Sequence, residues 1–136
     1  MDKTIVAGVK ELESVIDEIK KKDIYIILLK GDLASGKTTL VKEFVKSLGI
    51  GDEVSSPTFS IMNVYDNRVY HYDIYNQGSE KFFESGLLEN LELDGYHLIE
   101  WADERIRSIL KSYGFSFLEV EIYPKDDKRE YKICIN

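Results

Sequence analysis

The stretch that decides the fold is "ILLKGDLASGKTTLV", residues 27–41. Its first residues complete an apolar, β-branched run, and its last residues begin an apolar pattern with helical spacing. Between the two, Gly31, Gly36, Lys37 and Thr38 fit the pattern G-x-x-x-x-G-K-[ST]. A loop of this pattern between a buried strand and a helix is typical of a nucleotide phosphate site. The stretch therefore predicts a strand, a phosphate-binding loop and a helix in succession.

Each residue type in this loop has a chemical reason to be there. Glycines allow the backbone to approach closely, so that successive N–H groups turn toward the phosphates, and the helix N-terminus adds its positive end. Lys37 is expected to reach the β- and γ-phosphates, and Thr38 to offer its hydroxyl to Mg²⁺. The alternative interpretation is a plain glycine turn. It fits less well, because chance seldom places four such residues at this spacing in this context.

Composition and length restrict the class of protein. The chain has 136 residues, is 43% hydrophobic and 32% charged, and is expected to form a single domain over residues 1–136. No run of 18 apolar residues occurs, and the N-terminus lacks the apolar segment of a secretory signal. We therefore expect a cytoplasmic protein without a membrane partner. The lone Cys134 is expected to be a buried or half-buried small residue.

The acidic charge argues against direct nucleic-acid binding. The formal net charge is −7, whereas affinity for a phosphate backbone comes largely from clustered Lys and Arg. The single basic run, residues 20–22, falls where a helix is expected to end, and cations there complement the helix dipole. No strong direct contact with RNA is expected.

Hydrophobic periodicity alternates between helix and strand along the chain. It predicts helices at about 8–22, 37–48, 79–92 and 102–112, buried strands at 24–30 and 96–101, and two hairpins at 58–75 and 115–136. The first hairpin turns through Asp66-Asn67-Arg68 and the second through "PKDDK". This order predicts an α/β fold of the three-layer, P-loop NTPase-like kind. Its central sheet would be mostly parallel, with antiparallel hairpin strands added and helices on both faces.

Two carboxylates are candidates to serve a magnesium nucleotide. Glu100 follows the apolar run of "HLIEW", as a metal-binding carboxylate at a strand end should, although it could instead face solvent there. Asp73 competes with it. In "VYHYDIY", His71, Asp73 and Tyr75 share one face of a strand. That face is equally compatible with a ligand site and with the solvated side of a hairpin.

Four motifs together resemble a known family. "GDLASGKTT", "SSPTF" at 55–59, "HYDIY" at 71–75 and "LIEWAD" at 98–103 are similar in order and spacing to the TsaE (YjeE) family of small bacterial ATPases. The resemblance covers essentially the whole chain. It implies a role in threonylcarbamoyl modification of adenosine 37 (t6A) in tRNA, with ATP, Mg²⁺ and, after hydrolysis, ADP at the site.

The resemblance also implies roles for individual residues. Lys37, Asp73 and Thr58 would be catalytic, with Thr58 in a switch-like loop near the γ-phosphate. Thr38 and Glu100 would bind Mg²⁺. Trp101 could contact the nucleotide or a partner, or simply cap the core. The nucleotide-binding set is Gly31, Ala34, Ser35, Gly36, Lys37, Thr38, Thr39, Asp73, Trp101 and Arg129.

The resemblance finally implies protein partners, TsaB and TsaD, whose assembly the ATP cycle would reset between turnovers. Segments 55–60 and 71–78 contain no Arg or Lys, so we expect the isolated chain to hydrolyse ATP slowly and its partners to complete or order the site. The alternative is a small-molecule or protein kinase of the P-loop class. A lid-type kinase supplies several arginines to the phosphoryl group, yet segment 77–95 contains Lys81 as its only basic residue. A GTPase would carry an Asn-Lys-x-Asp motif, and no Asn in the chain precedes a Lys. Asn76 stands where the family often has an arginine.

Overall fold

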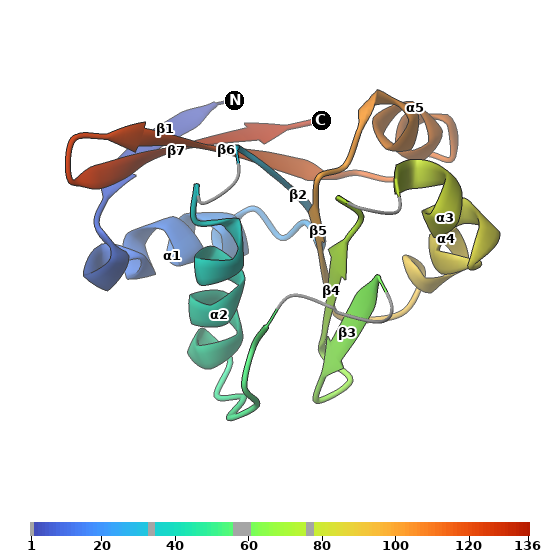
Figure 1. Cartoon of the computed structure of the whole chain (residues 1–136), viewed down its shortest axis with the longest axis horizontal. Coiled ribbons are helices and arrows are strands. Elements are labelled where there is room, and N and C mark those ends of the chain that lie inside the picture. The colour runs from blue at the N-terminus through green and yellow to red at the C-terminus, as the bar shows by residue number, and fades with distance from the viewer. Residues whose placement is uncertain (1, 33–34, 56–60, 76–77) are drawn as a thin grey trace.

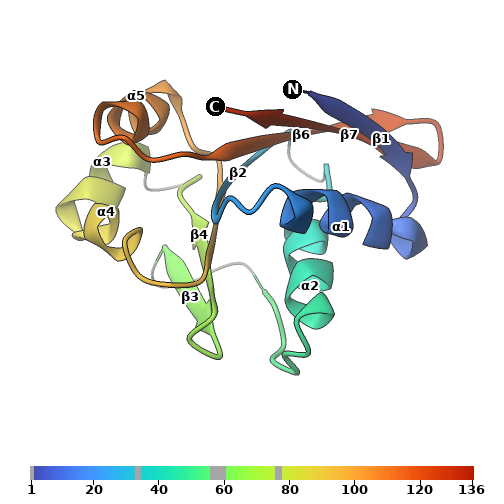
Figure 2. The same cartoon turned by 180° about the vertical axis from the view of Figure 1, so that it is seen from behind.

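A seven-stranded mixed sheet forms the centre of the computed structural model (Figure 1). The structure describes residues 2–32, 35–55, 61–75 and 78–136. Helices cover both faces of the sheet, which confirms the predicted α/β class with three layers (Figures 1 and 2).

The strands follow the order β1-β7-β6-β2-β5-β4-β3 across the sheet. The four central strands, β6, β2, β5 and β4, run parallel to one another, and the outer pairings β1–β7, β7–β6 and β4–β3 are antiparallel. The predicted parallel centre with added hairpin strands is thus confirmed. The strand bounds are β1 Lys3–Ala7, β2 Ile26–Lys30, β3 Met62–Tyr65, β4 Val69–Asp73, β5 Tyr96–Glu100, β6 Leu118–Lys125 and β7 Lys128–Ile135.

Helices α1 and α2 pack on one face of the sheet, and α3, α4 and α5 pack on the other. Each layer buries its own apolar cluster against the strands. The predicted helix over 79–92 is two short helices, separated by a turn at Ser85 and Gly86. The helix bounds are η1 Val9–Glu11 (a 3-10 turn), α1 Glu13–Lys21, α2 Lys37–Ser47, α3 Gly78–Glu84, α4 Leu87–Asn90 and α5 Glu104–Ser112.

Strand β2 shows why an uninterrupted apolar run belongs at the centre of this sheet. Ile27 and Leu29 point into the cluster under α1 and α2, whereas Ile26 and Leu28 point into the cluster under α5. All four are at most 5% exposed. A strand with helices on both faces has no solvated side, so every residue of it can be apolar.

The first residues of the chain depart from the prediction. A helix was expected from about residue 8, but residues 3–7 form β1, and the α-helix begins only at Glu13. Val9, counted in the predicted apolar stripe, is 53% exposed and lies in the 3-10 turn. The cause is remote in sequence: β1 pairs with β7, with Ala7 opposite Arg129. Those backbone bonds hold the chain extended up to Gly8.

The two predicted hairpins are confirmed. In the turn between β3 and β4, Asp66 and Asn67 both have positive φ, +52° and +50°, which suits a two-residue hairpin turn. The β6–β7 hairpin turns at Asp126 and Asp127. Among the described residues, no helix is both long and apolar enough to cross a membrane.

Candidate functional site

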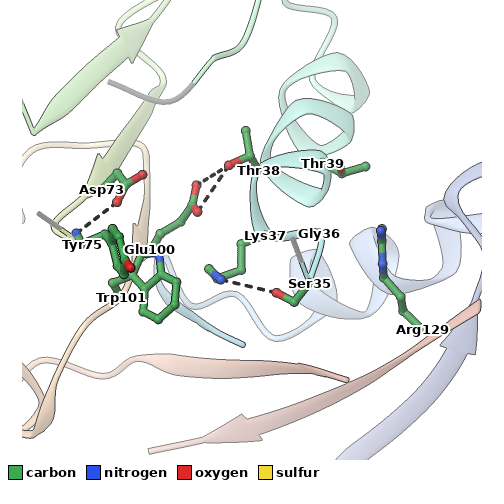
Figure 3. Close-up of a pocket in the computed structure, with 10 residues that line it drawn as sticks. All are labelled: Ser35, Gly36, Lys37, Thr38, Thr39, Asp73, Tyr75, Glu100, Trp101 and Arg129. Atoms are coloured by element: carbon green, nitrogen blue, oxygen red, sulfur yellow. Dashed lines mark hydrogen bonds between the residues drawn. The ribbon is translucent and has the colours of Figure 1, made fainter. Parts of the chain in front are cut away.

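The carboxyl ends of β2, β4 and β5 meet beside the N-terminus of α2, and a pocket of about 400 Å³ opens there (Figure 3). Parallel strands bring their carboxyl ends to one edge of a sheet, which is where open α/β sheets bind ligands. The pocket collects residues from four separate segments of the chain. Its lining consists of residues 35–39 with Asp73, Tyr75, Glu100, Trp101 and Arg129.

The two motif glycines are required by close packing. A Cβ on Gly31 would lie 2.5 Å from the Ser35 hydroxyl oxygen and 2.9 Å from the Ile122 carbonyl oxygen. Gly36 has φ +104°, and a Cβ there would lie 2.5 Å from Nη1 of Arg129. Any side chain at either position would therefore distort the loop or displace Arg129.

Lys37 is a buried cation at the centre of the pocket. Its ammonium donates to the carbonyl oxygens of Gly31 and Asp32 at 2.7 and 2.8 Å. It also lies 4.1 Å from the centroid of the Trp101 ring. Burial lowers the pKa of Lys37, and the carboxylates of Glu100, Asp73 and Asp32 oppose that effect. The residue is only 5% exposed, and its ammonium lies against the backbone of the loop.

Glu100 lies against the start of α2 and not in solvent. The Thr38 hydroxyl donates to its carboxylate, with distances of 3.0 and 3.3 Å to the two oxygens. Nε2 of His71 lies 2.5 Å from Oε2 of the same carboxylate. Glu100 is 3% exposed. The alternative interpretation of a solvent-facing glutamate is therefore wrong, because the parallel β2–β5 pairing brings this strand end beside the loop.

The face shared by His71, Asp73 and Tyr75 is directed toward the pocket. Asp73 and Tyr75 line it, and the Asp73 carboxylate accepts the backbone N–H of Tyr75 at 3.1 Å. His71 is fully buried. The alternative of a solvated hairpin face is wrong for His71, which is buried, whereas Tyr75, beyond the end of β4, is 49% exposed.

Trp101 lies between the core and the pocket. Its ring packs at the border of the cluster under α5, and it also lines the pocket above Lys37. Its φ is +67°, an uncommon value for a bulky residue. The Tyr75 ring makes a tilted contact with the indole, with 4.6 Å between centroids and an interplanar angle of 44°. The indole thus forms a wall of the pocket.

Arg129 reaches the pocket from β7, on the side opposite Asp73 and Glu100 (Figure 3). Its guanidinium lies over Gly36, close enough to exclude a side chain there. Nη1 is buried and has no hydrogen-bond partner in the part of the chain that the structure describes. The Tyr131 hydroxyl interacts with Arg129: burial raises the pKa of Tyr131, and the guanidinium opposes this.

The predicted site residues Ala34 and Thr58, and the position of Asn76, lie outside the described residues. The other predicted site residues line the pocket, except for Gly31, which shapes the loop beneath it. The contact of His71 with Glu100 was not foreseen. The spacing of His71 and Asp73, two residues apart on one strand, predicted that they share a face, but it did not predict that His71 would contact Glu100.

Thr38 and Glu100 are the pocket residues that could hold a metal ion together with other ligands. Over residues 2–32, 35–55, 61–75 and 78–136, no group of three or more His, Cys, Asp or Glu side chains could hold a metal ion. Mg²⁺ is commonly bound by one or two carboxylates together with substrate phosphates and water. The Thr38 hydroxyl and the Glu100 carboxylate provide such a partial ligand set.

Comparison with known proteins agrees with this geometry. A family model described as "Threonylcarbamoyl adenosine biosynthesis protein TsaE" matches residues 6–131. The chain belongs to the TsaE family. This confirms the resemblance drawn from the four motifs, and it identifies the chain as a member of a family of threonylcarbamoyl adenosine biosynthesis proteins.

Individual TsaE relatives are similar over much of their length. The TsaE protein of Treponema pallidum is 43% identical over 91 residues, which cover 65% of this chain and 67% of the relative. The Bacillus subtilis TsaE protein is 36% identical over 116 residues, covering 77% of this chain and 66% of the relative. The crystal structure of Bacillus subtilis YdiB matches with a TM-score of 0.64 and 27% identity, over 98% of this chain and 86% of that one.

Proposed function

We propose that this TsaE family member is a Mg²⁺-dependent ATPase, which converts ATP to ADP and phosphate and thereby drives the TsaB–TsaD threonylcarbamoyl-transfer complex through its cycle on tRNA. The observation that carries the proposal is the contact of Thr38 with Glu100 at 3.0 Å. It joins the end of the phosphate-binding loop to the end of a neighbouring strand, which is where a nucleotide-bound Mg²⁺ is held in P-loop proteins.

The packing of the loop supports a phosphate ligand. Gly31 and Gly36 leave the backbone bare where side chains would otherwise fill the space. Lys37 and Arg129 bring two cations to one small pocket, and Nη1 of Arg129 has no hydrogen-bond partner among the described residues. A polyanion would satisfy both cations and the N–H groups at the start of α2.

The pocket has two ends, which would orient a bound triphosphate. Glu100 and Asp73 lie at one end, with Thr38, and the γ-phosphate is proposed to lie there. Thr39 and Arg129 lie toward the other end, and the α-phosphate is proposed to lie there. When bound, Mg²⁺ would be held by Thr38 and Glu100 and would neutralise charge on the β- and γ-phosphates.

Asp73 is the candidate to orient the attacking water. It lines the pocket on the strand next to Glu100, and its backbone pairs directly with that of Glu100. In hydrolysis the water oxygen would bond to the γ-phosphorus while the bond to the ADP oxygen breaks, and the carboxylate would accept the hydrogen bond of the water. Thr58 is proposed to lie near the γ-phosphate on the strength of the motif alone.

The γ-phosphate end lacks an arginine among the described residues that line the pocket. Arg129, the arginine of that lining, lies at the opposite end, and an arginine supplied by a partner can contribute about 10³–10⁵-fold in P-loop enzymes. We therefore expect the isolated chain to bind ATP but to hydrolyse it slowly, well below the roughly 1–100 s⁻¹ typical of kinases. Docking on TsaB and TsaD would complete or order the site.

The test is steady-state phosphate release at saturating ATP, with the pure chain, with TsaB and TsaD together, and with each partner alone. Slow release that rises only with both partners supports the proposal. Rapid turnover without partners, or no change on adding them, contradicts partner dependence. Competition of ATP binding by ADP, GTP and CTP is measured alongside, and preference for GTP would contradict the ATPase assignment.

A further inference from the structure

His71 is a buried polar side chain directly behind the proposed metal ligand Glu100. It is 0% exposed, and its Nε2 lies 2.5 Å from Oε2 of Glu100. Thr38, at the start of α2, donates to the same Oε2 at 3.0 Å. Glu100 is thus held between a histidine of β4 and a hydroxyl of the phosphate-binding loop.

The register of the sheet makes this contact possible. In the parallel β4–β5 pairing, Asp73 lies opposite Glu100 and His71 lies opposite Leu98. His71 and Glu100 are therefore diagonal neighbours on one face, a separation that long side chains can bridge. Asp73 lies directly opposite Glu100 in this pairing, and its side chain lines the pocket.

The hydrogen bonds around the imidazole indicate its tautomer. Nδ1 of His71 is buried without a hydrogen-bond partner in the described part of the chain. A buried N–H without an acceptor is costly, so the proton belongs on Nε2, where a carboxylate accepts it. The Tyr65 ring is inclined by 27° to the imidazole, with 6.5 Å between the two centroids.

We propose that His71 is a positioning residue, which fixes the Glu100 carboxylate so that it faces Thr38 and the metal of a bound magnesium nucleotide. The inference rests on the proposed Mg²⁺-dependent ATP site and adds a residue to it. Without the imidazole, the buried carboxylate would lose a donor and could turn away from Thr38. Partners that hold a metal-binding carboxylate commonly change metal affinity by about 10–100-fold when removed.

The chain contains a matched control in its second histidine. His97 is also buried, at 1% exposed, and its Nδ1 accepts the Tyr72 hydroxyl at 2.7 Å while Nε2 donates to the Leu93 carbonyl oxygen at 2.9 Å. It stacks on Tyr70 in the cluster on the other face of the sheet and does not line the pocket. Removal of His97 therefore reports on the loss of a buried, hydrogen-bonded histidine that does not line the pocket.

The experiment measures ATP affinity by calorimetry as Mg²⁺ is titrated, and separately without Mg²⁺, for the wild type, His71→Leu and His97→Leu. For His71→Leu, we expect the Mg²⁺ concentration that gives half of the affinity gain to rise about 10–100-fold, with little change in Mg²⁺-free affinity. His97→Leu should leave the Mg²⁺ titration unchanged, even if it lowers the melting temperature.

A second pair of variants separates positioning from folding. Gln can place an amide N–H near the position of Nε2, whereas Asn is too short to do so. His71→Gln should recover most of the Mg²⁺ response and His71→Asn should not, and this comparison decides the matter if His71→Leu does not fold.

An equal Mg²⁺ response in His71→Asn and the wild type would overturn the inference. If instead the wild type showed no Mg²⁺ dependence, the proposed function itself would fail.

Discussion

The two ends of the pocket are built in opposite ways. At the acidic end, Glu100 is buried and already holds hydrogen bonds from Thr38 and His71. At the basic end, Arg129 keeps a buried Nη1 without a partner among the described residues. The acidic end is thus organised by the protein itself, whereas the basic end has donor capacity that a ligand would use.

The difference follows from where each end lies in the sheet. The acidic end lies at the carboxyl ends of β4 and β5, interior parallel strands with neighbours on both sides. Arg129 lies next to the turn of the β6–β7 hairpin, where it pairs with Pro124 on one side and Ala7 on the other. We therefore expect the acidic end to control metal binding and hydrolysis, and the basic end to control nucleotide affinity.

The largest effect is expected at the centre, where Lys37 serves both ends. Lys37→Ala should abolish measurable ATP binding by calorimetry, because it removes the buried cation that would contact the β- and γ-phosphates. Lys42→Ala, which removes an exposed lysine of the same helix, is the control and should bind normally. Unchanged affinity in Lys37→Ala would contradict the site.

The acidic end can be divided by comparing Asp73→Ala with Glu100→Ala. Asp73→Ala should lower phosphate release by about 10²–10⁴-fold, the range for a positioned acid–base group, and leave ATP binding nearly intact. Glu100→Ala should weaken Mg²⁺-dependent binding more than Mg²⁺-free binding. Exchanged phenotypes would make Asp73 the metal ligand.

The basic end should affect binding without affecting the rate. Arg129→Gln is expected to weaken ATP and ADP by a similar factor, about 10–100-fold, since a hydrogen bond to a charged group contributes about 1.5–3 kcal/mol. Phosphate release at saturating ATP should change little. Arg68→Gln, which alters an exposed arginine in the β3–β4 turn, is the control. A rate loss confined to Arg129→Gln would place that residue at the γ-phosphate instead.

The smallest effect is expected for His97, which lies at neither end of the pocket. Burial lowers the pKa of His97 below its usual 6.5. A lowered folded-state pKa means that the unfolded chain binds the proton more readily, so the contribution to stability is present above pH 6.5 and is lost as the pH falls toward the folded-state value.

Thermal melts of the wild type and His97→Gln at several values between pH 7.5 and 5.5 measure this contribution. The wild type should lose a little more stability on acidification than the variant does. Equal slopes would show that His97 does not contribute.

The local chemistry of this protein could be predicted from its sequence. The motif ending in Lys37 and Thr38, the apolar run of β2 and the turn residues Asp66 and Asn67 each act through neighbours in the chain. The order of strands and helices follows from such signals, and so does the α/β class. The position of Glu100 at a strand end was also predictable, because a carboxylate that follows an apolar run falls at a strand end whatever the strand order.

Strand β1 and the pairing partners of the site could not be predicted in this way. Residues 3–7 are extended because β7 offers them backbone hydrogen bonds. His71 contacts Glu100 because β4 and β5 pair in one parallel register. A shift of this register by one residue would place the two side chains on opposite faces of the sheet.

The sequence by itself thus determined the glycine-rich loop and the strand-end carboxylate on which the proposed nucleotide site rests, because motif spacing and periodicity are local properties of the chain. Only the tertiary structure decided that His71 supports Glu100 and that Arg129 closes the opposite end over Gly36. Those contacts depend on strand order and register, which arise from hydrogen bonds and packing between segments that are distant in sequence.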